Sequence, residues 1–193
     1  MARKKEFDRE TVLEKAMEVF WSQGYEATSI QDLVESMGIN RGSLYDTFTD
    51  KHTLFLAVIA HYQKTVFEQT FAHLAAPGAS KQAIIDHFHA VVDRAIADGR
   101  RWGCLMTNAI VELSAHDSAI AACTQANLQQ IESIFYQALV SAQQQGELKP
   151  DPDLRALARY LTASMQGLRV ISKVMPDPDV LRDIVKVVLS TLD

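Results

Sequence analysis

The stretch that decides the fold covers residues 24–51 and reads GYEATSIQDLVESMGINRGSLYDTFTDK. Ser29 followed by Asp32 has the spacing of a capping box and predicts the start of a short helix. Gly38 predicts the tight turn that ends this helix, and Asn40 is a good N-cap for a second one. Two short helices joined by a glycine-containing turn are typical of a helix-turn-helix.

The side chains of the second short helix suit contact with DNA. The N-terminal end of such a helix can lie in the major groove, where base edges carry a distinctive pattern of donors and acceptors. Arg41 and Ser43 lie near that end, whereas Leu44 and Phe48 are expected to point back into the module. Lys51 begins the next predicted helix and adds a cation for a DNA phosphate.

Residues 24–51 closely resemble the TetR family of transcriptional regulators, and the remaining chain is similar in length and helical character. The resemblance implies a three-helix DNA-binding module followed by a helical body that binds a small-molecule inducer and forms a homodimer. It also implies which positions contact DNA, with phosphate contacts at the start of the first short helix and a reading surface on the second. These positions are Thr28, Ser29, Asn40, Arg41, Gly42, Ser43, Tyr45, Thr47 and Lys51.

Apolar residues recur at helical spacing throughout the chain, which predicts an all-α fold with about nine helices. One long helix is expected from about 118 to about 145. Asp151-Pro152 and Asp177-Pro178 each have an N-cap residue before a proline and predict two further helix starts. We expect a DNA-binding domain at 1–50 and a body at 51–193, which share a helix because no flexible linker follows Asp50.

Composition limits the kinds of partner that the chain can have. Its 193 residues include 19 Lys or Arg against 24 Asp or Glu, a net charge of −5, so it is not a protein that coats nucleic acid indiscriminately. Residues 1–55 are also net acidic, and attraction to DNA must therefore come from the placement of individual cations. Arg3, Lys4 and Lys5 form either a basic arm that reaches the DNA backbone or minor groove, or a solvated tail.

The chain is expected to be a soluble cytoplasmic protein with no membrane partner. Two cysteines cannot form a disulfide framework, which favours a reducing compartment. The charged N-terminus lacks the apolar core of a signal peptide.

Several large apolar side chains of the body are candidates for the lining of a ligand cavity. Ordinary core packing is the alternative for each of them. The candidates are Phe67, Phe71, Phe88, Trp102, Met106, Ile110, Phe135 and Met165.

Cys104 is a candidate redox sensor. It follows Arg100-Arg101 and lies near the start of a predicted helix, and both features lower the pKa of a thiol. The Gly-Cys-Leu at this position also resembles a subgroup of the family whose repressors sense electrophiles or oxidants through cysteine. Lys173 is a further candidate cation, the alternative role for Cys104 is a small buried hydrophobe, and Cys123 is expected to be structural packing.

The sequence offers no catalytic constellation, so we expect neither an enzyme nor a cofactor. His87 and His89 are two residues apart and would face different ways on a helix, which makes them a poor metal pair. Glu112 and His116 would share a helix face, where either a metal or an ordinary helix pair is possible and the helix pair is favoured, so no metal is expected.

The last two predicted helices carry apolar residues on more than one side and therefore need two packing partners. One partner is the core of the chain, and the other is expected to be the same helices of a second copy. These observations favour a homodimeric repressor that binds a palindromic operator and is released by a ligand or by thiol modification. The alternative is a helical small-molecule-binding protein or adaptor whose helix-turn-helix is vestigial.

Overall fold

The computed structural model describes residues 7–97, 99–149 and 152–193, and these ranges contain helices and no strands. With α4, η1 and α5 taken as one continuous rod, the described ranges form nine helices, which confirms the all-α prediction. The elements are α1 (Arg9–Gln23), α2 (Ile30–Met37), α3 (Arg41–Phe48), α4 (Lys51–Tyr62), the π-helical η1 (Gln63–Phe67), α5 (Glu68–Phe71), α6 (Lys81–Ala97), α7 (Leu105–Leu113), α8 (Ser118–Gln144), α9 (Leu154–Val174), α10 (Pro178–Leu189) and the 3-10 turn η2 (Ser190–Leu192).

The predicted helix-turn-helix is formed by α2 and α3, and its local signals are confirmed. The Ser29 N–H donates to Asp32 Oδ2 at 2.8 Å while the Asp32 N–H donates to Ser29 Oγ at 3.1 Å, which completes the capping box. Gly38 ends α2 in the left-handed region, with a φ of 69°. The side chain of Asn40 caps α3 by accepting from the Ser43 N–H at 2.9 Å.

The core of this module is built from the inner faces of α1, α2, α3 and α4. Leu44 is 0% exposed and Phe48 is 1% exposed, so both point inward as predicted. The ring of Phe20 on α1 meets the ring of Phe55 on α4 edge-on, with 4.9 Å between centroids. Removing a buried aromatic ring such as that of Phe20, Phe48 or Phe55 costs about 3–5 kcal/mol of stability, so the buried faces of α1, α3 and α4 stabilise the module as one unit.

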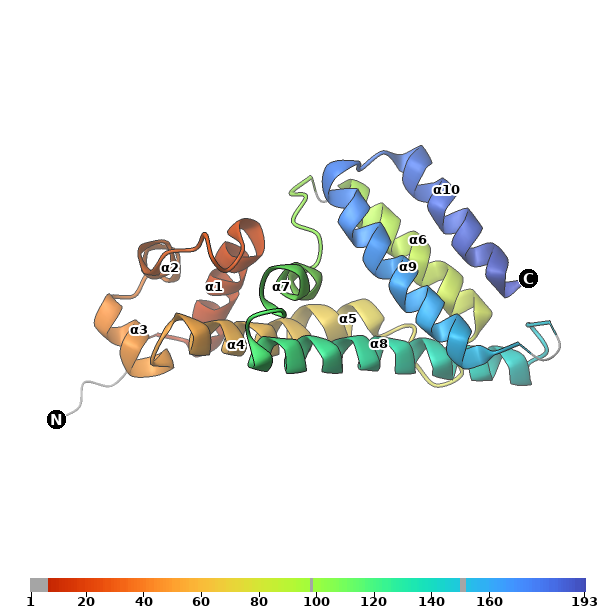
Figure 1. The fold of residues 1–193 in the computed structure, drawn as a ribbon, viewed down its shortest axis with the longest axis horizontal. Helices are drawn as coiled ribbons and strands as arrows, with labels where there is room; N and C mark the ends of the chain where they lie inside the picture. Colours follow the sequence, from red (N-terminus) through yellow and green to blue (C-terminus); the bar gives the residue numbers. More distant parts are fainter. Residues whose placement is uncertain (1–6, 98, 150–151) are drawn as a thin grey trace.

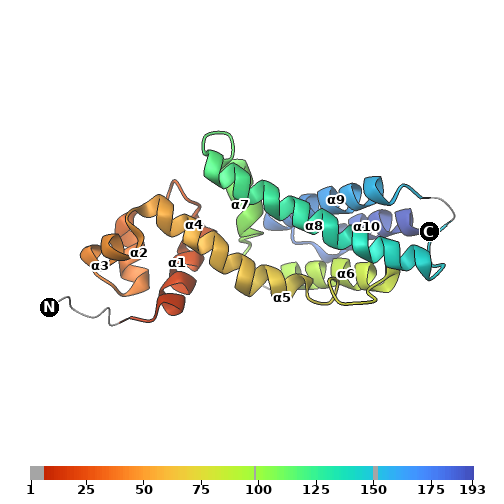
Figure 2. The ribbon, with the colours of Figure 1, turned by 90° about the horizontal axis from the view of Figure 1, so that it is seen from below.

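A continuous helical rod links the two parts of the molecule (Figures 1 and 2). Asp50 caps its start, because Asp50 Oδ1 accepts from the Thr53 N–H at 2.6 Å. The rod passes from α4 through η1 into α5 and ends at Phe71. The π-helical segment was not predicted, because apolar spacing does not distinguish it from an ordinary helical turn.

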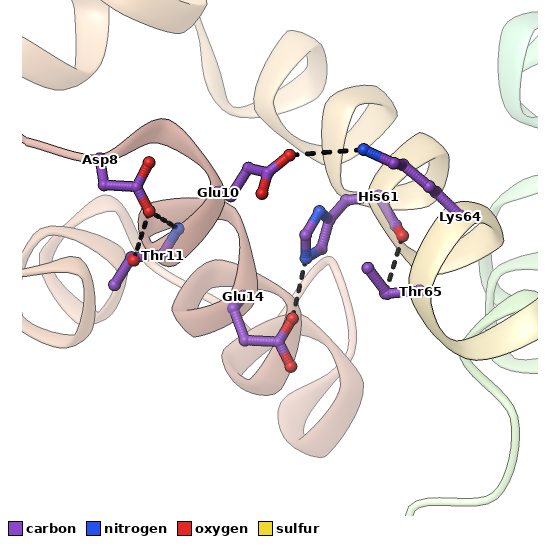
Figure 3. A network of polar contacts seen from close by, with 7 residues as sticks. All are labelled: Asp8, Glu10, Thr11, Glu14, His61, Lys64 and Thr65. Carbon is purple, nitrogen blue, oxygen red and sulfur yellow. Dashed lines mark hydrogen bonds and ion pairs between the residues drawn. The ribbon is translucent and has the colours of Figure 1, made fainter. Parts of the chain in front are cut away.

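Polar side chains attach α1 to this rod on the outer surface (Figure 3). Glu14 Oε2 lies 2.8 Å from His61 Nε2, and Glu10 Oε1 lies 3.4 Å from Lys64 Nζ. The first helix therefore directs part of its acidic surface toward the rod. Exposed ion pairs contribute at most about 1 kcal/mol each, so they orient α1 more than they stabilise it.

The body gathers α6, α9 and α10 side by side, with α8 running along them and α7 between them and the N-terminal module (Figures 1 and 2). Asp177 caps α10 and Pro178 opens it, as predicted. The other predicted start, at Asp151-Pro152, is wrong: α9 begins at Leu154, and its N-cap is Asp153. Asp151 itself lies outside the described residues.

His87 is a histidine buried in the core of the body. Its ring centroid lies 4.6 Å from that of Phe71 and 5.9 Å from that of Phe135, and Nε2 lies 3.4 Å from Met165 Sδ. Burial lowers the pKa of His87 to about 3, and the positive charge of Arg169 adds to the effect. The side chain is therefore neutral in the folded protein at neutral pH.

This histidine predicts acid sensitivity of the fold. The pKa of His87 is near 6.5 in the unfolded chain and about 3 in the folded chain. The contribution of neutral His87 to the free energy of unfolding is therefore fully present above pH 6.5 and is lost as the pH falls. Between about pH 7.5 and about pH 5 the loss from this residue is about 2 kcal/mol. Urea melts should show that His87→Phe removes this part of the loss, whereas His89→Phe, at an exposed position of the same helix, does not. Equal acid sensitivity of wild type and His87→Phe would contradict the prediction.

Candidate nucleic-acid interface and adjoining cavity

The outer face of α3 is the candidate nucleic-acid interface, and it lies at the end of the molecule farthest from the C-terminus (Figure 1). Asn40, Arg41 and Gly42 are exposed at its N-terminal end, and Tyr45 is 47% exposed one turn later. The Arg41 guanidinium on α3 donates from Nη2 to Gln31 Oε1 on α2 at 3.2 Å, which orients it toward α2. This face therefore presents polar and aromatic side chains outward while the opposite face is buried.

The remaining predicted DNA contacts lie around this face, with one exception. Ser29 is exposed, and Ser43, Thr47 and Lys51 are half-buried. Lys51 Nζ lies 4.3 Å from the centroid of the Tyr25 ring, so a cation–π contact orients it.

Thr28 is the exception, and its assignment as a phosphate contact is not supported by its position. Its side chain is 1% exposed, and its hydroxyl donates to the Gly24 carbonyl at 2.6 Å. This hydroxyl serves the turn between α1 and α2. The basic arm of Arg3, Lys4 and Lys5 lies outside the described residues.

Glu112 on α7 connects the body to the N-terminal module. Its carboxylate accepts from the Tyr25 N–H at 3.0 Å and from the Glu26 N–H at 2.8 Å. A nearby ion pair joins His52 Nε2 to Asp117 Oδ2 at 2.7 Å. Glu112 thus bonds to the turn after α1. Within the part of the chain that the structure describes, no group of His, Cys, Asp and Glu side chains forms a metal site.

The N-terminal module and the body also meet where α1 contacts the connection between α6 and α7, here called the junction. Trp21 donates from Nε1 to the Gly103 carbonyl at 3.2 Å, and its ring centroid lies 5.9 Å from that of Trp102. Tyr62 on the shared rod packs edge-on against Trp21 at 5.2 Å. Figure 1 shows this connection between α6 and α7 lying between α1 and the C-terminal end of α9.

A cavity of about 530 Å³ opens at this junction, within the size range of small-molecule sites. Its walls come from α1, the shared rod, α6, the connection to α7, and α9. The lining residues are Glu14, Met17, Glu18, Trp21, Tyr62, Val66, Thr70, Val91, Arg94, Ala95, Ala97, Arg100, Arg101, Trp102, Gly103, Cys104, Arg169, Ser172 and Lys173.

Of the eight residues predicted to line a cavity, Trp102 lines this one, and the other seven are not part of its walls. Phe88, Phe135 and Met165 are 0% exposed and form the core of the body. The same holds for Phe67, Phe71 and Met106, each at most 5% exposed, and Ile110 is half-buried on α7. Large apolar residues at helical spacing mark a packed interior as readily as a cavity wall.

Cys104 lies at the cavity wall as the N-cap residue of α7 and is 4% exposed. Its Sγ accepts from Arg169 Nη1 at 3.2 Å and lies 3.4 Å from the Tyr62 hydroxyl. Burial alone would raise the pKa of the thiol, but the Arg169 charge and the hydrogen bond from Tyr62 outweigh it, and the pKa is lowered. The arrangement therefore favours the thiolate.

The cation beside this thiol is not one that the sequence indicated. Lys173 donates from Nζ to Asn108 Oδ1 at 3.0 Å, and Arg169 takes the position next to Sγ. Arg169 and Tyr62 stand far from Cys104 in the sequence, so no local pattern could have found them. Cys123 is half-buried and packs against the core, in keeping with a structural role.

Both parts of the chain match known protein families. Residues 12–58 match the family described as bacterial regulatory proteins, tetR family, and residues 78–188 match the tetracyclin repressor-like C-terminal domain. The chain belongs to the TetR family. It is a transcriptional regulator of a family of DNA-binding proteins, not of enzymes, as the sequence predicted.

Individual TetR relatives extend over the whole chain. The chain is 43% identical over 194 residues to the HTH-type transcriptional regulator YezE of Bacillus subtilis (strain 168), with 100% of both chains covered. It is 35% identical over 172 residues to the HTH-type transcriptional repressor ComR of Escherichia coli (strain K12), covering 89% of this chain and 82% of ComR.

No helix in the described part of the chain is long and apolar enough to cross a membrane.

Among solved structures, a cysteine-substituted form of the TetR family transcriptional regulator CifR is similar to this chain over its full length. That protein is complexed with 26 bp double-strand operator DNA. The TM-score is 0.87 at 28% identity, with 100% of both chains covered. The arrangement of helices is therefore one that occurs in a regulator bound to its operator.

Proposed function

We propose that the chain is a homodimeric repressor that binds a palindromic operator through α3 and is released by a ligand or by modification of Cys104. The observation that carries this proposal is the exposed polar face of α3, held by a buried apolar face on the opposite side. It is supported by the similarity to a CifR structure with operator DNA and to the repressor ComR.

The proposed division is a DNA-binding domain at 1–50 and a body at 51–193. In the DNA-binding domain, exposed or half-buried residues at the start of α2, on α3 and at the start of α4 contact the operator. Those residues are Ser29, Asn40, Arg41, Gly42, Ser43, Tyr45, Thr47 and Lys51.

The proposed dimer uses α9 and α10 of two copies. On α9 the exposed face carries Tyr160, Val170 and Val174, which are 42%, 48% and 80% exposed, around the small Gly167. On α10, Val187 is 65% exposed. An apolar stripe of this kind on neighbouring helices suits a four-helix bundle about a two-fold axis.

Release from DNA would follow from the position of the cavity. Its walls include α1 of the DNA-binding domain and α9 of the proposed dimer interface. A group added at Cys104 would change the packing between these two helices and so the separation of the two α3 helices. A conformation with the wrong separation no longer fits both half-sites.

Binding to the operator should depend on Arg41. Replacing Arg41 with Ala removes a cation from the proposed reading surface and should weaken specific binding by about 1–3 kcal/mol, or about fivefold to 150-fold. Gel shifts at fixed salt with the DNA upstream of the gene for this chain would measure the effect. Lys149→Ala, an exposed cation in the connection between α8 and α9, is the matched control and should bind normally. Undiminished specific binding by Arg41→Ala would contradict the proposed surface.

The dimer interface can be tested with two valines of equal exposure. Val174 on α9 and Val111 on α7 are both 80% exposed, but only Val174 belongs to the proposed interface. Val174→Glu places a charge in a desolvated contact and should convert the dimer to monomer at micromolar concentration, whereas Val111→Glu should not. Analytical ultracentrifugation would report the state of both variants. Dimers of Val174→Glu as stable as wild type would exclude this face.

Thiol modification should release the operator through one cysteine. N-Ethylmaleimide accepts the Cys104 thiolate at its double bond: a carbon–sulfur bond forms, and the adjacent carbon takes a proton from water. Wild type and Cys123→Ser should then lose operator binding, whereas Cys104→Ser should keep it. Because the pKa of Cys104 is lowered, the modification should reach its full rate at a lower pH than for an ordinary cysteine. Release of Cys104→Ser by the reagent would remove this thiol as a sensor.

A further inference from the structure

We propose that the cavity at the junction binds an organic anion, a carboxylate joined to an apolar body, as the natural ligand of this regulator. The proposal deepens the proposed function, since it names the class of ligand that releases the protein from DNA. It rests on the charges, the walls and the position of the cavity.

Positive charge is concentrated at this cavity in a chain that is net acidic. Five of its lining residues are Arg or Lys, in a protein whose net charge is −5. Within the described ranges, none of Arg101, Arg169 and Lys173 lies within ion-pair distance of a carboxylate. Uncompensated cations at one cavity favour a negatively charged ligand.

The sulfur of Cys104 is a partner for only one of these cations. Its Sγ lies 3.2 Å from Arg169 Nη1 and accepts a hydrogen bond from that guanidinium. Lys173 is bonded to a neutral amide, that of Asn108. Arg101 and Lys173 therefore remain available to a carboxylate of the ligand.

The backbone next to Cys104 holds Lys173 in place. Gly103 adopts a φ of 69°, and a Cβ built there would lie 2.7 Å from Lys173 Cδ. The missing side chain at Gly103 thus lets the stem of Lys173 cross the chain at this point. Its ammonium then lies at the cavity, where it can meet an anion with a geometry that is already formed.

The remaining walls suit an apolar body. Trp21, Tyr62 and Trp102 supply aromatic faces, while Met17 and Val66 supply aliphatic surface. A cavity of about 530 Å³ accommodates a ring or a chain of several carbons with its carboxylate.

The acidic residues of the cavity fix the orientation of such a ligand. Glu14 and Glu18 lie on the α1 side, and Glu14 is already bonded to His61. A carboxylate is repelled from that side and attracted to Arg101 and Lys173 on the other. The apolar body then lies against α1, so that the ligand touches the DNA-binding domain directly.

The two tryptophans of the chain provide the measurement. Trp21 and Trp102 both line the cavity and are the only ones among the 193 residues. Ligand binding to the full-length protein without DNA can therefore be followed by tryptophan fluorescence. The probes are 3-phenylpropanoate and octanoate, each compared with its neutral primary amide.

Each carboxylate should bind at least about tenfold more tightly than its amide, and the difference should shrink as salt is added. The variant Arg101→Gln/Lys173→Gln should lose about tenfold or more in carboxylate affinity and leave the amide affinity unchanged. The control Lys149→Gln/Arg159→Gln removes the same charge from exposed positions away from the cavity and should bind like wild type. Circular dichroism melts confirm that both double variants are folded.

Amides that bind as tightly as the acids would overturn the proposal. So would the absence of any fluorescence change with either acid, or full carboxylate affinity in Arg101→Gln/Lys173→Gln. These readouts involve no DNA, so a failure here differs from a failure of operator binding in gel shifts. A regulator that binds its operator but fails these tests keeps the proposed function and loses only this ligand class.

Discussion

The position of α3, the candidate DNA-contacting helix, depends on the packing of α1 against the shared rod. Phe55 on α4 contacts the rings of both Phe20 and Tyr25, at 4.9 Å and 5.0 Å between centroids. Because α4 continues through η1 into α5 without a break, the same rod belongs to the core of the module and to the core of the body. Any movement of the body that tilts this rod therefore carries α3 with it.

Polar contacts add a second constraint at the same junction. Glu112 holds the turn after α1 from one side, and Trp21 holds the connection before α7 from the other. A hydrogen bond to a charged group contributes about 1.5–3 kcal/mol, and one between neutral groups about 1 kcal/mol. These contacts are strong enough to set the orientation of the module on the body. They are also weak enough to break when that orientation changes.

The sequence predicted well those features that depend on neighbouring residues. The capping box of Ser29, the cap at Asn40 and the inward direction of Leu44 follow from spacing within one or two turns. The site at the junction depends on contacts between segments that are far apart in the sequence, and these contacts were not predicted. Cys104 was found as a candidate, but its partner Arg169 was not, because nothing in the chain near Arg169 marks it as facing a thiol.

The residues predicted to line a cavity differ from the walls of this one for a related physical reason. Phe88 and Phe135 stack on each other in the core, and a core and a cavity wall have the same composition when read along one helix. The cavity is distinguished by its cations, and these come from α6, the connection to α7, and α9. Only the fold brings their charges together.

The energies at the junction make a ligand-driven change feasible. A ligand present at a hundred times its dissociation constant stabilises the state that binds it by about 2.7 kcal/mol. That amount is comparable with the contribution of the Glu112 contacts, about 1.5–3 kcal/mol for each charged hydrogen bond. An occupant of the cavity touches Trp21 on α1 and Lys173 on α9, so its binding energy acts on the position of α1, which the Glu112 contacts from α7 also set. A junction held by apolar packing alone, at about 3–5 kcal/mol for each buried ring, would resist a ligand of ordinary affinity.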